Sequence, residues 1–376
     1  MTRLPGLRPE GKTSHEATRQ GNRRVLLQLV FDDGPISRAD LARATELGRA
    51  TVSEIVADLI GEGLVVEVGR GSSTGGKPPT LVELDPDGRF TVAVDLGTRP
   101  IAAALVNLRG RIVGSASGKG VTTRGRDLLD EVHRLVAELI GNATAPALGI
   151  GLGVPGAVDE QGGVVRSEQL DWQDLPLRGE LEDVYGLPAH VAADAEVAAI
   201  AEFGRSAPTP NTSMLYVMVD DRVTVAVVAD GRLQRTPRRG GDLTHLTTDS
   251  DKRCACGRQG CLGTEVSVLE ILGPDAGDIS TEARRRLAAE TNPDATKAAN
   301  TLGAAIAPIV AGLDIDMVVI GGQFAEWNDV ATAVSGGIED ALGQSPPVVV
   351  SQLGQSAVLL GAAGQVLSSE LGVVWS

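Results

Sequence analysis

Aromatic side chains are scarce in this sequence: Phe, Tyr and Trp together make up 2% of its 376 residues, while hydrophobic residues reach 42%. The core must therefore be built mainly from Val, Leu, Ile and Ala. The chain also lacks an apolar run of membrane-spanning length, and its first twenty residues are polar and charged. Neither a membrane helix nor a signal peptide is expected. This length allows two or three globular domains.

Cysteine is also sparse, and its distribution is informative. Cys254, Cys256 and Cys261 are the three cysteines of the chain, and His245 lies just upstream. Zinc accepts thiolate and imidazole in a closed tetrahedral shell, so we predict a structural Cys₃His zinc site on these four residues. Three unrelated free thiols are the alternative, and spacing alone does not prove that His245 is the fourth ligand. Reduced thiols without a disulfide pattern predict a cytoplasmic protein.

Positive charge is in deficit, because 34 Lys and Arg stand against 49 Asp and Glu, for a net charge of −15. Taken as an average, this charge argues against a nucleic-acid partner. Residues 1–80, however, carry eleven basic and ten acidic side chains, so nearly all of the acidity lies downstream. A near-neutral front end can present a local basic face to phosphate groups.

The front end has the pattern of a small helical domain. Residues 1–20 lack apolar periodicity and are predicted to be a flexible arm. A helical pattern begins at Asn22, with these residues on one face: Val25, Leu26, Leu29 and Val30. Ser37 then has the position of a helix cap, with Asp40 three residues on, and this second helix runs to about Thr45.

A third helix and a hairpin complete a winged helix-turn-helix pattern. After a turn at residues 46–48, apolar residues recur at helical spacing from Val52 to Ile60, and two predicted strands, 64–68 and 80–84, flank a Gly-rich loop. The third helix would enter the major groove of DNA. The candidate DNA contacts are Arg38, Arg49, Thr51, Ser53, Arg70 and Lys77. An ordinary helical packing module with a hairpin is the alternative.

Beyond a linker turn at residues 85–89, the pattern changes to alternating strands and helices, which is typical of α/β domains. Strands are predicted at 90–95, 101–107, 111–115 and 147–151, with a helix near 128–140. A similar rhythm resumes at Met214 and continues through 317–322 to the C-terminus. We therefore predict two related α/β lobes.

The chain resembles the ROK family of sugar kinases and transcriptional repressors, from about residue 22 to its end. The matching segments are CxCGxxGC at 254–261, His245 in an ExGH-like segment, Gly153-Val154-Pro155-Gly156, Asp194-Ala195 and Val318–Gly322. The resemblance implies an α/β protein with a winged helix-turn-helix (21–86) followed by a two-lobed, actin-like, sugar-kinase type domain (87–376). That second domain would bind an effector and assemble as a homodimer or homotetramer.

The segments that family kinases use to hold ATP are altered. Asp95-Leu96-Gly97-Thr98-Arg99-Pro100 resembles DxGGT, with Thr98 in place of a glycine and with Pro100 removing a backbone donor. Residues 220–226 stand where kinases have GTGIGGG, and their side chains would block the approach of backbone N–H groups to phosphate. Asp220 and Asp221 would also repel a triphosphate. We therefore expect neither ATP binding nor enzyme activity.

The sugar-binding segments are only partly kept. Asp194 matches the family catalytic base and is expected either to accept a hydrogen bond from an effector or to be merely structural. Ala193, Asp242, Thr244 and Gly263 stand where the family has Asn, Glu, Gly and Glu, and lost polar partners would weaken binding of an ordinary hexose. The resemblance implies effector binding by Asp194, Glu196, Asp242 and His245. Zinc on His245 would fix the loop that carries Asp242.

The favoured interpretation is a DNA-binding transcriptional regulator, most simply a repressor, whose partners are a double-stranded DNA operator and a sugar or sugar-derivative effector. A sugar kinase with an additional N-terminal domain is one alternative. A DNA-binding regulator that responds to no ligand is the other.

Overall fold

The computed structural model describes residues 15–71, 78–97, 101–118, 123–207, 209, 211–236, 238–272 and 292–375. The chain divides into two compact units. One comprises the residues up to Arg89 together with Ser368–Val374, and the other comprises Phe90–Leu367 with the last two residues. Within the described ranges, no helix is both long and apolar enough to cross a membrane.

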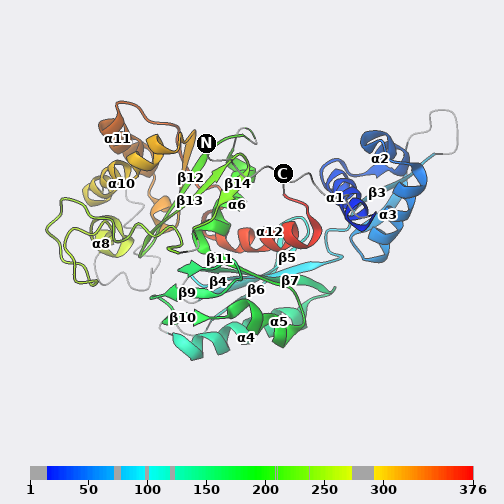
Figure 1. The fold of residues 1–376 in the computed structure, drawn as a ribbon, viewed down its shortest axis with the longest axis horizontal. Helices are drawn as coiled ribbons and strands as arrows, with labels where there is room; N and C mark the ends of the chain where they lie inside the picture. Colours follow the sequence, from blue (N-terminus) through cyan, green and yellow to red (C-terminus); the bar gives the residue numbers. More distant parts are fainter. Residues whose placement is uncertain are drawn as a thin grey trace, which may run out of the picture. The chain divides into compact units, whose positions relative to one another are not determined.

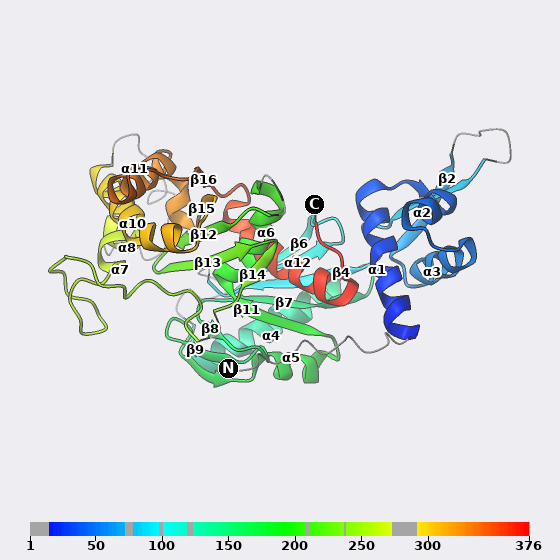
Figure 2. The same ribbon diagram turned by 45° about the horizontal axis from the view of Figure 1, so that its top comes forward.

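The first unit contains three helices and a small sheet (Figures 1 and 2). Its elements are α1 (His15–Asp33), β1 (Ile36–Ser37), α2 (Arg38–Thr45), α3 (Arg49–Gly61), β2 (Val65–Arg70) and β3 (Thr80–Leu84), with sheet order β1-β3-β2. The Ser37 hydroxyl accepts a hydrogen bond from Asp40 N at 3.1 Å, which caps α2 as its sequence predicts. Two helices followed by a hairpin form a winged helix-turn-helix domain.

Helix α1 differs from its prediction in two respects. It begins at His15, so residues 15–20 are helical and do not belong to a flexible arm. Val25 was placed on the buried face but is 52% exposed, whereas Leu26, Leu27 and Val30 are fully buried. The buried stripe of α1 is therefore rotated from the predicted one, because Leu27 replaces Val25 on it.

The end of the chain joins this first unit. Val374 N donates to Gln28 Oε1 at 3.0 Å, and Gln28 Nε2 donates to the Val374 carbonyl at 3.2 Å. The predicted division had placed every residue after 86 in the second domain. The structure instead groups Ser368–Val374 with the helix-turn-helix, because these backbone contacts attach the segment to α1.

The second unit contains two five-stranded sheets. The first has the order β11-β7-β4-β5-β6, formed by β4 (Phe90–Asp95), β5 (Ala102–Asn107), β6 (Ile112–Ser117), β7 (Ala147–Val154) and β11 (Ala189–Ala193). The second has the order β14-β13-β12-β15-β16, formed by β12 (Met214–Val219), β13 (Val223–Ala229), β14 (Arg232–Gln234), β15 (Met317–Gly321) and β16 (Val348–Val350).

The two sheets have the same plan. In each, three consecutive strands run antiparallel, and two later strands add in parallel beside the first of them. β4 and β5 in the first sheet thus correspond to β12 and β13 in the second. This confirms the predicted pair of related α/β lobes.

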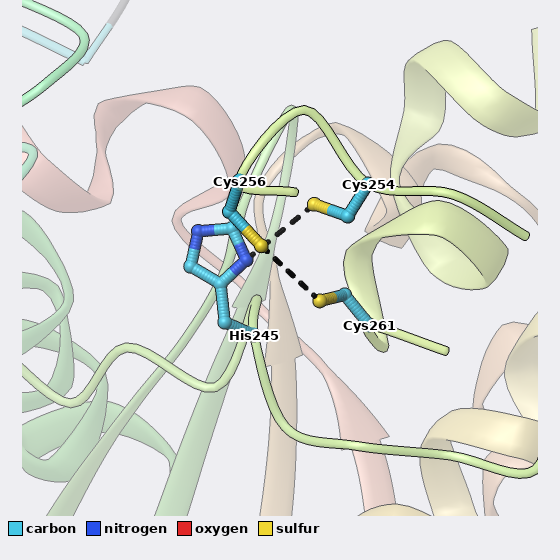
Figure 3. A group of neighbouring side chains, drawn as sticks. All are labelled: His245, Cys254, Cys256 and Cys261. Atoms are coloured by element: carbon cyan, nitrogen blue, oxygen red, sulfur yellow. Dashed lines mark hydrogen bonds between the residues drawn. The ribbon is translucent and has the colours of Figure 1, made fainter. Parts of the chain in front are cut away.

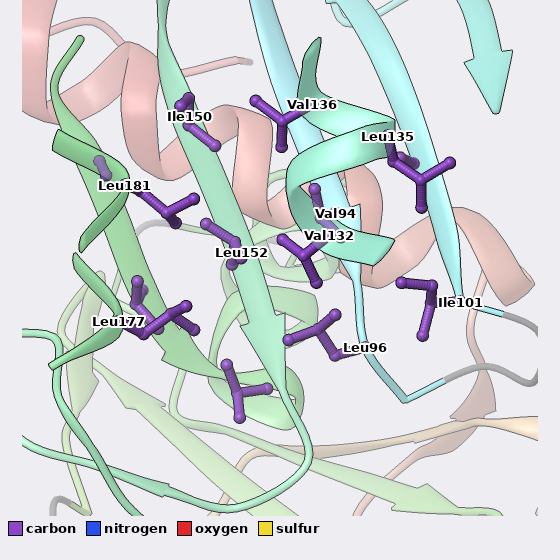
Figure 4. Close-up of a cluster of buried hydrophobic side chains, with 14 of the residues drawn as sticks. Val94, Leu96, Ile101, Val132, Leu135, Val136, Ile150, Leu152, Leu177 and Leu181 are labelled. Atoms are coloured by element: carbon purple, nitrogen blue, oxygen red, sulfur yellow. The ribbon is translucent and has the colours of Figure 1, made fainter. Parts of the chain in front are cut away.

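Helices cover both faces of each sheet. They are α4 (Gly125–Asn142), α5 (Leu177–Tyr185), α6 (Asp194–Ser206), α7 (Gly263–Val266), α8 (Val268–Leu272), α10 (Pro293–Gly312), α11 (Val330–Leu342) and α12 (Ala357–Leu371). Aliphatic side chains such as Leu135 on α4 and Ile150 on β7 form the core of the first lobe (Figure 4). Helices α6 and α12 pack against the opposite face and reach the second sheet.

Short elements connect these layers. They are the three-stranded sheet of β8 (Ala157–Val158), β9 (Val164–Ser167) and β10 (Trp172–Leu175), and the 3₁₀ turns η2 (Gln323–Glu326) and η3 (Gly354–Ser356). The Gly153–Gly156 segment spans the end of β7 and the β7–β8 connection, and η2 directly follows Gly322. Both of the family-like segments therefore lie at the ends of central strands.

Candidate functional site

The three cysteines and His245 meet at one point of the second unit (Figure 3). Each offers one ligand atom, and these four atoms lie within 4.8 Å of one another. Cys254 Sγ is 3.6 Å from His245 Nδ1, and Cys256 Sγ is 3.6 Å from Cys261 Sγ. Two thiolates bonded at about 2.3 Å to one tetrahedral zinc stand about 3.8 Å apart, so the donors are spaced as one ion requires. The predicted Cys₃His cluster, able to hold a structural zinc, is confirmed.

The zinc ligands differ in their surroundings. Cys256 is exposed and Cys261 is buried. Hydrogen bonds from Arg258 lower the pKa of the Cys256 thiol to about 6, whereas burial raises the pKa of the Cys261 thiol to about 11. A zinc ion binds thiolates, so its charge would offset the burial that keeps Cys261 protonated.

Asp194 is the first residue of α6, directly after β11. Its side chain is buried, and burial raises the pKa of this carboxyl to about 7 against the opposing charge of Arg222. Oδ1 accepts a hydrogen bond from Ala195 N at 2.8 Å. A Cβ on Gly97 would lie 3.2 Å from Asp95 Oδ1 and 3.4 Å from Asp194 Oδ2, so the end of β4 meets the start of α6. Near neutral pH, Asp194 can therefore donate to a ligand or accept from it.

Asp242 is paired with Arg222. Nη2 of the arginine lies 2.8 Å from Oδ2 of the acid, and Thr244 N donates to Oδ1 at 2.8 Å. Burial alone would raise the pKa of Asp242, but Arg222 and the Thr244 hydrogen bonds outweigh it and hold that pKa below its ordinary value. An isolated bridge between Thr224 and Asp242 aligns the loop with β13. Both oxygens of Asp242 therefore already have protein donors.

Glu196, another predicted effector contact, is also engaged. Its side chain is buried, and Oε1 accepts hydrogen bonds from Thr236 N at 2.8 Å and from Thr236 Oγ1 at 3.1 Å. Oε2 lies 3.7 Å from Arg235 Nε. Glu196 thus fixes the loop after β14 against α6, and its effector contact stays a prediction, as does that of His245.

The second nucleotide segment is a three-residue turn. β12 ends at Val219 and β13 begins at Val223, so Val223–Ala226 belong to a strand and the predicted seven-residue loop is wrong. Antiparallel pairing of these residues with β12 accounts for the difference. Asp220 N donates to Arg222 O at 3.0 Å, which closes the turn.

The Asp220 side chain reaches the other nucleotide segment. Its Oδ1 accepts a hydrogen bond from Gln323 N at 2.7 Å, directly after Gly321-Gly322. Burial raises the pKa of this carboxyl to about 6. A backbone donor at the start of η2 is therefore taken by a carboxyl of the same chain. In the first loop, Thr98, Arg99 and Pro100 lie outside the described residues.

A separate hollow of about 650 Å³ lies beside the first half of α10, lined by Asn292, Pro293, Thr296, Lys297, Asn300, Thr301, Trp327 and Asp329. Among the described residues, the buried Trp327 Nε1 has no hydrogen-bond partner. None of the predicted effector-binding residues is in this lining.

The predicted recognition helix presents the residues that its sequence suggested. Arg49, Thr51 and Ser53 are exposed on the first turns of α3, while its apolar positions are buried. Glu54 and Asp58 on the same helix lie 3.2 and 2.6 Å from Arg19 Nη2 on α1. That pairing reduces the negative charge on α3.

The remaining predicted DNA contacts have different surroundings. Arg38 forms an ion pair with Glu67 at 2.9 Å, so contact with a phosphate would replace a surface pair worth under about 1 kcal/mol. Arg70 is exposed at the end of β2. Lys77 lies outside the described residues. All six DNA contacts stay predictions.

The sequence missed the two contacts that define the second turn. The sequence pattern assigns Arg222 no partner and does not predict the bond from Gln323 N to Asp220. Charged residues at positions where kinases have glycine were the available signal. Their partners lie 20 and 103 positions away, beyond the reach of local spacing.

Comparison with known proteins agrees with these observations. The model of the ROK family matches residues 91–368. The xylose repressor of Bacillus subtilis (strain 168) is 26% identical over 372 residues, covering 94% of this chain and 96% of that protein.

Two solved structures share the fold. A ROK family transcriptional regulator, described as a homologue of the E. coli Mlc protein, has a TM-score of 0.76 at 24% identity and covers 94% of this chain and 96% of its own. A ROK glucokinase from Streptomyces griseus, solved with glucose and AMPPNP, has a TM-score of 0.61 at 23% identity and covers 73% of this chain and 98% of its own. Because the family model spans well over half of its residues, this chain belongs to the ROK family.

Proposed function

We propose that this chain is a DNA-binding transcriptional repressor that senses a sugar or sugar derivative through a ROK domain that does not phosphorylate it. One observation carries the proposal. A winged helix-turn-helix precedes a ROK domain in which the Asp220 carboxyl takes a backbone donor of the nucleotide segment. Full-length similarity to a protein named a xylose repressor supports the same conclusion.

Phosphoryl transfer places special demands on the second turn. Enzymes of this kind depend on backbone N–H groups and cations that hold the phosphates and neutralise their charge. Here Gln323 N already donates to Asp220, so this backbone donor is not available to a phosphate. Asp194 keeps the place of the catalytic base, and beside a second turn altered in this way it would serve as a ligand contact.

The DNA-binding half of the proposal requires two copies of the chain. A homodimer or homotetramer would present paired α3 helices to a roughly palindromic operator, with half-sites about one helical turn apart. A sugar that binds the two lobes would change operator affinity only if it binds the DNA-competent and the released states differently.

The test is footprinting of the purified full-length protein on genomic DNA, followed by release of the bound operator with a sugar panel that includes xylose and glucose. Arg49→Ala should weaken operator binding by about 1–3 kcal/mol, because this exposed side chain lies at the N-terminus of α3. Arg126→Ala, an exposed change on α4 of the ROK domain, is the matched control. Equal loss in both variants would contradict the assigned DNA face.

The main rival is a sugar kinase, favoured by the retained Asp194 and by the shared fold with a glucokinase. A coupled ATP assay with the same sugars separates the two. An operator that binds but is released by no sugar would instead identify a regulator that responds to no ligand of this class.

A further inference from the structure

We propose that the effector carries an anionic group, a phosphate ester or a carboxylate, and that Arg222 is the residue that recognises it. This inference rests on the proposed function, because it concerns the ligand of the same site. It begins from the balance of donors and acceptors around Asp194.

The acceptors of the site are largely occupied. Asp242 receives hydrogen bonds from Arg222 and Thr244, and Glu196 receives two from Thr236. A neutral sugar brings many hydroxyl donors, which need carboxylate or carbonyl acceptors. Asp194 Oδ2 and Glu196 Oε2 are the carboxylate oxygens of this set to which no hydrogen bond is assigned among the described residues, and Glu196 Oε2 lies 3.7 Å from Arg235 Nε. A neutral polyol is therefore poorly matched to these side chains.

Arg222 offers the site hydrogen-bond donors. A guanidinium has five N–H donors in a planar fork that suits phosphate and carboxylate oxygens. Within the described part of the chain, the Arg222 side chain hydrogen-bonds only to Asp242, through Nη2. Its side chain is 23% exposed, so the remaining N–H groups are within reach of a ligand. An anion at this position would complete the coordination of Arg222.

Arg222 lies in the segment that the family resemblance aligns with the second phosphate loop of the kinases. It occupies the turn between β12 and β13, in place of the glycine loop, and its charge acts directly on Asp194. A sugar hydroxyl bound by Asp194 would thus direct its own substituent toward Arg222. The altered turn exchanges binding of a nucleotide phosphate for binding of an anionic group on the sugar itself.

The neighbouring loop adds positive charge. Residues 232–241 contain four arginines and no acid, in a chain of net charge −15. Arg238 and Arg239 are exposed, and neither forms an ion pair within the described residues. A Cβ on Gly240 would lie 2.3 Å from Gly156 O, so this loop packs on the sugar-site segment. Its arginines raise the local potential that attracts an anion.

Nearby carboxyls act in the opposite direction: the exposed Asp221 beside Arg222 repels an anion, whereas Asp194 and Asp220 do so only weakly. Burial raises the pKa of Asp194 to about 7 and that of Asp220 to about 6. Both groups are therefore partly protonated near neutral pH and repel an anion less than two full charges would. Asp242 is ionised but directly neutralised by Arg222.

The test uses the full-length protein and isothermal titration with matched probes: glucose, glucose 6-phosphate and glucuronate, then xylose and xylose 5-phosphate, with inorganic phosphate alone. The anionic form should bind at least about tenfold more tightly than its neutral parent, because hydrogen bonds to a charged partner are about twice as strong. Arg222→Gln should bring that ratio close to one, and Arg222→Lys should restore part of it. Arg126→Gln, an exposed arginine on α4, should leave the ratio unchanged.

The readout is the ratio of anionic to neutral affinity within each variant. A general loss of stability would lower both affinities and would not change this ratio. Tight binding of the phosphate esters alone would support the proposal and identify a phosphate as the anion. Tight binding of the uronate alone would support it and identify a carboxylate. Neutral sugars that bind as tightly as both anionic forms, or a ratio that Arg222→Gln leaves intact, would overturn it while the proposed function stands. Binding of no sugar in any form would contradict the effector half of the proposed function and this inference together.

Discussion

The connections β4–β5 and β12–β13 occupy equivalent places in the two lobes but have different chemistry. After β4, Asp95 Oδ1 accepts a hydrogen bond from Gly97 N at 2.8 Å, two positions along the chain. After β12, Asp220 accepts a hydrogen bond from Gln323 N, and Arg222 pairs with Asp242. The second connection therefore has contacts that span 20 and 103 positions, and one shared topology supports it beside the first connection.

Under the proposed function, this difference indicates how a ROK domain could lose phosphoryl transfer and keep sugar binding. The strands and their order are set by alternating aliphatic residues, which are intact in both sheets. The nucleotide chemistry depends on three residues at a turn, and substitution there leaves the sheet unchanged. Four changes test how deeply the two turns differ, from the largest expected effect to the smallest.

Removal of zinc should have the largest effect, and on the second lobe alone. Cys261→Ser removes a buried ligand, so the purified protein should lose its zinc and about 5 kcal/mol or more of unfolding free energy. The loop that carries Asp242 should loosen and release Arg222. Metal analysis and hydrogen exchange measure both effects, with the exposed loop change Asp249→Ala as the control. Retained zinc, or equal loosening of β4–β5, would contradict this dependence.

Asp194 should make stability fall with rising pH. The folded pKa of about 7 lies above the ordinary value of 3.8, so the native state holds this proton where the unfolded chain has released it. This contribution to the unfolding free energy is present below about pH 4 and is lost by about 1.4 kcal/mol per unit up to pH 7. Asp194→Asn should remove that slope in urea titrations. If the unfolding free energy changed with pH in the same way for both proteins, the raised pKa of Asp194 would be excluded.

Asp220→Ala should lower the unfolding free energy by about 1–3 kcal/mol, because Gln323 N would lose its acceptor in a buried site. The measurement belongs at pH 5, where a pKa of about 6 keeps most of this carboxyl protonated. Asp220→Asn retains an acceptor oxygen and should cost less than about 1 kcal/mol. The exposed Asp340→Ala on α11 is the control and should stay within about 0.5 kcal/mol. Equal losses at 220 and 340 would show that the long-range bond contributes nothing.

Gly97→Ala should have the smallest effect on stability. The added methyl would meet only the flexible carboxylates of Asp95 and Asp194 at 3.2 and 3.4 Å, which can shift, so a loss under about 1 kcal/mol is expected. Sugar binding should nevertheless weaken, since Asp194 is displaced. A loss of unfolding free energy above about 3 kcal/mol in denaturant titration would mean that the first turn tolerates substitution no better than the second.

Local patterns predicted much of the fold. The cap at Ser37, the strand at 80–84 and the thiol cluster depend on neighbours a few positions apart, and each lies where its pattern indicated. The face of α1 was misplaced because Val25 and Leu27 are both apolar, and only packing selects Leu27. The contacts of Asp220 and Arg222 depend on two strands and a loop that meet only in the folded chain.

The most direct test of the central claim is a transfer assay with labelled ATP, Mg²⁺ and the full sugar panel, on the same protein preparation that binds its operator. We expect no labelled sugar above the protein-free blank, because Asp220 and Arg222 occupy the second turn. Saturable formation of a labelled sugar phosphate by that preparation would contradict it.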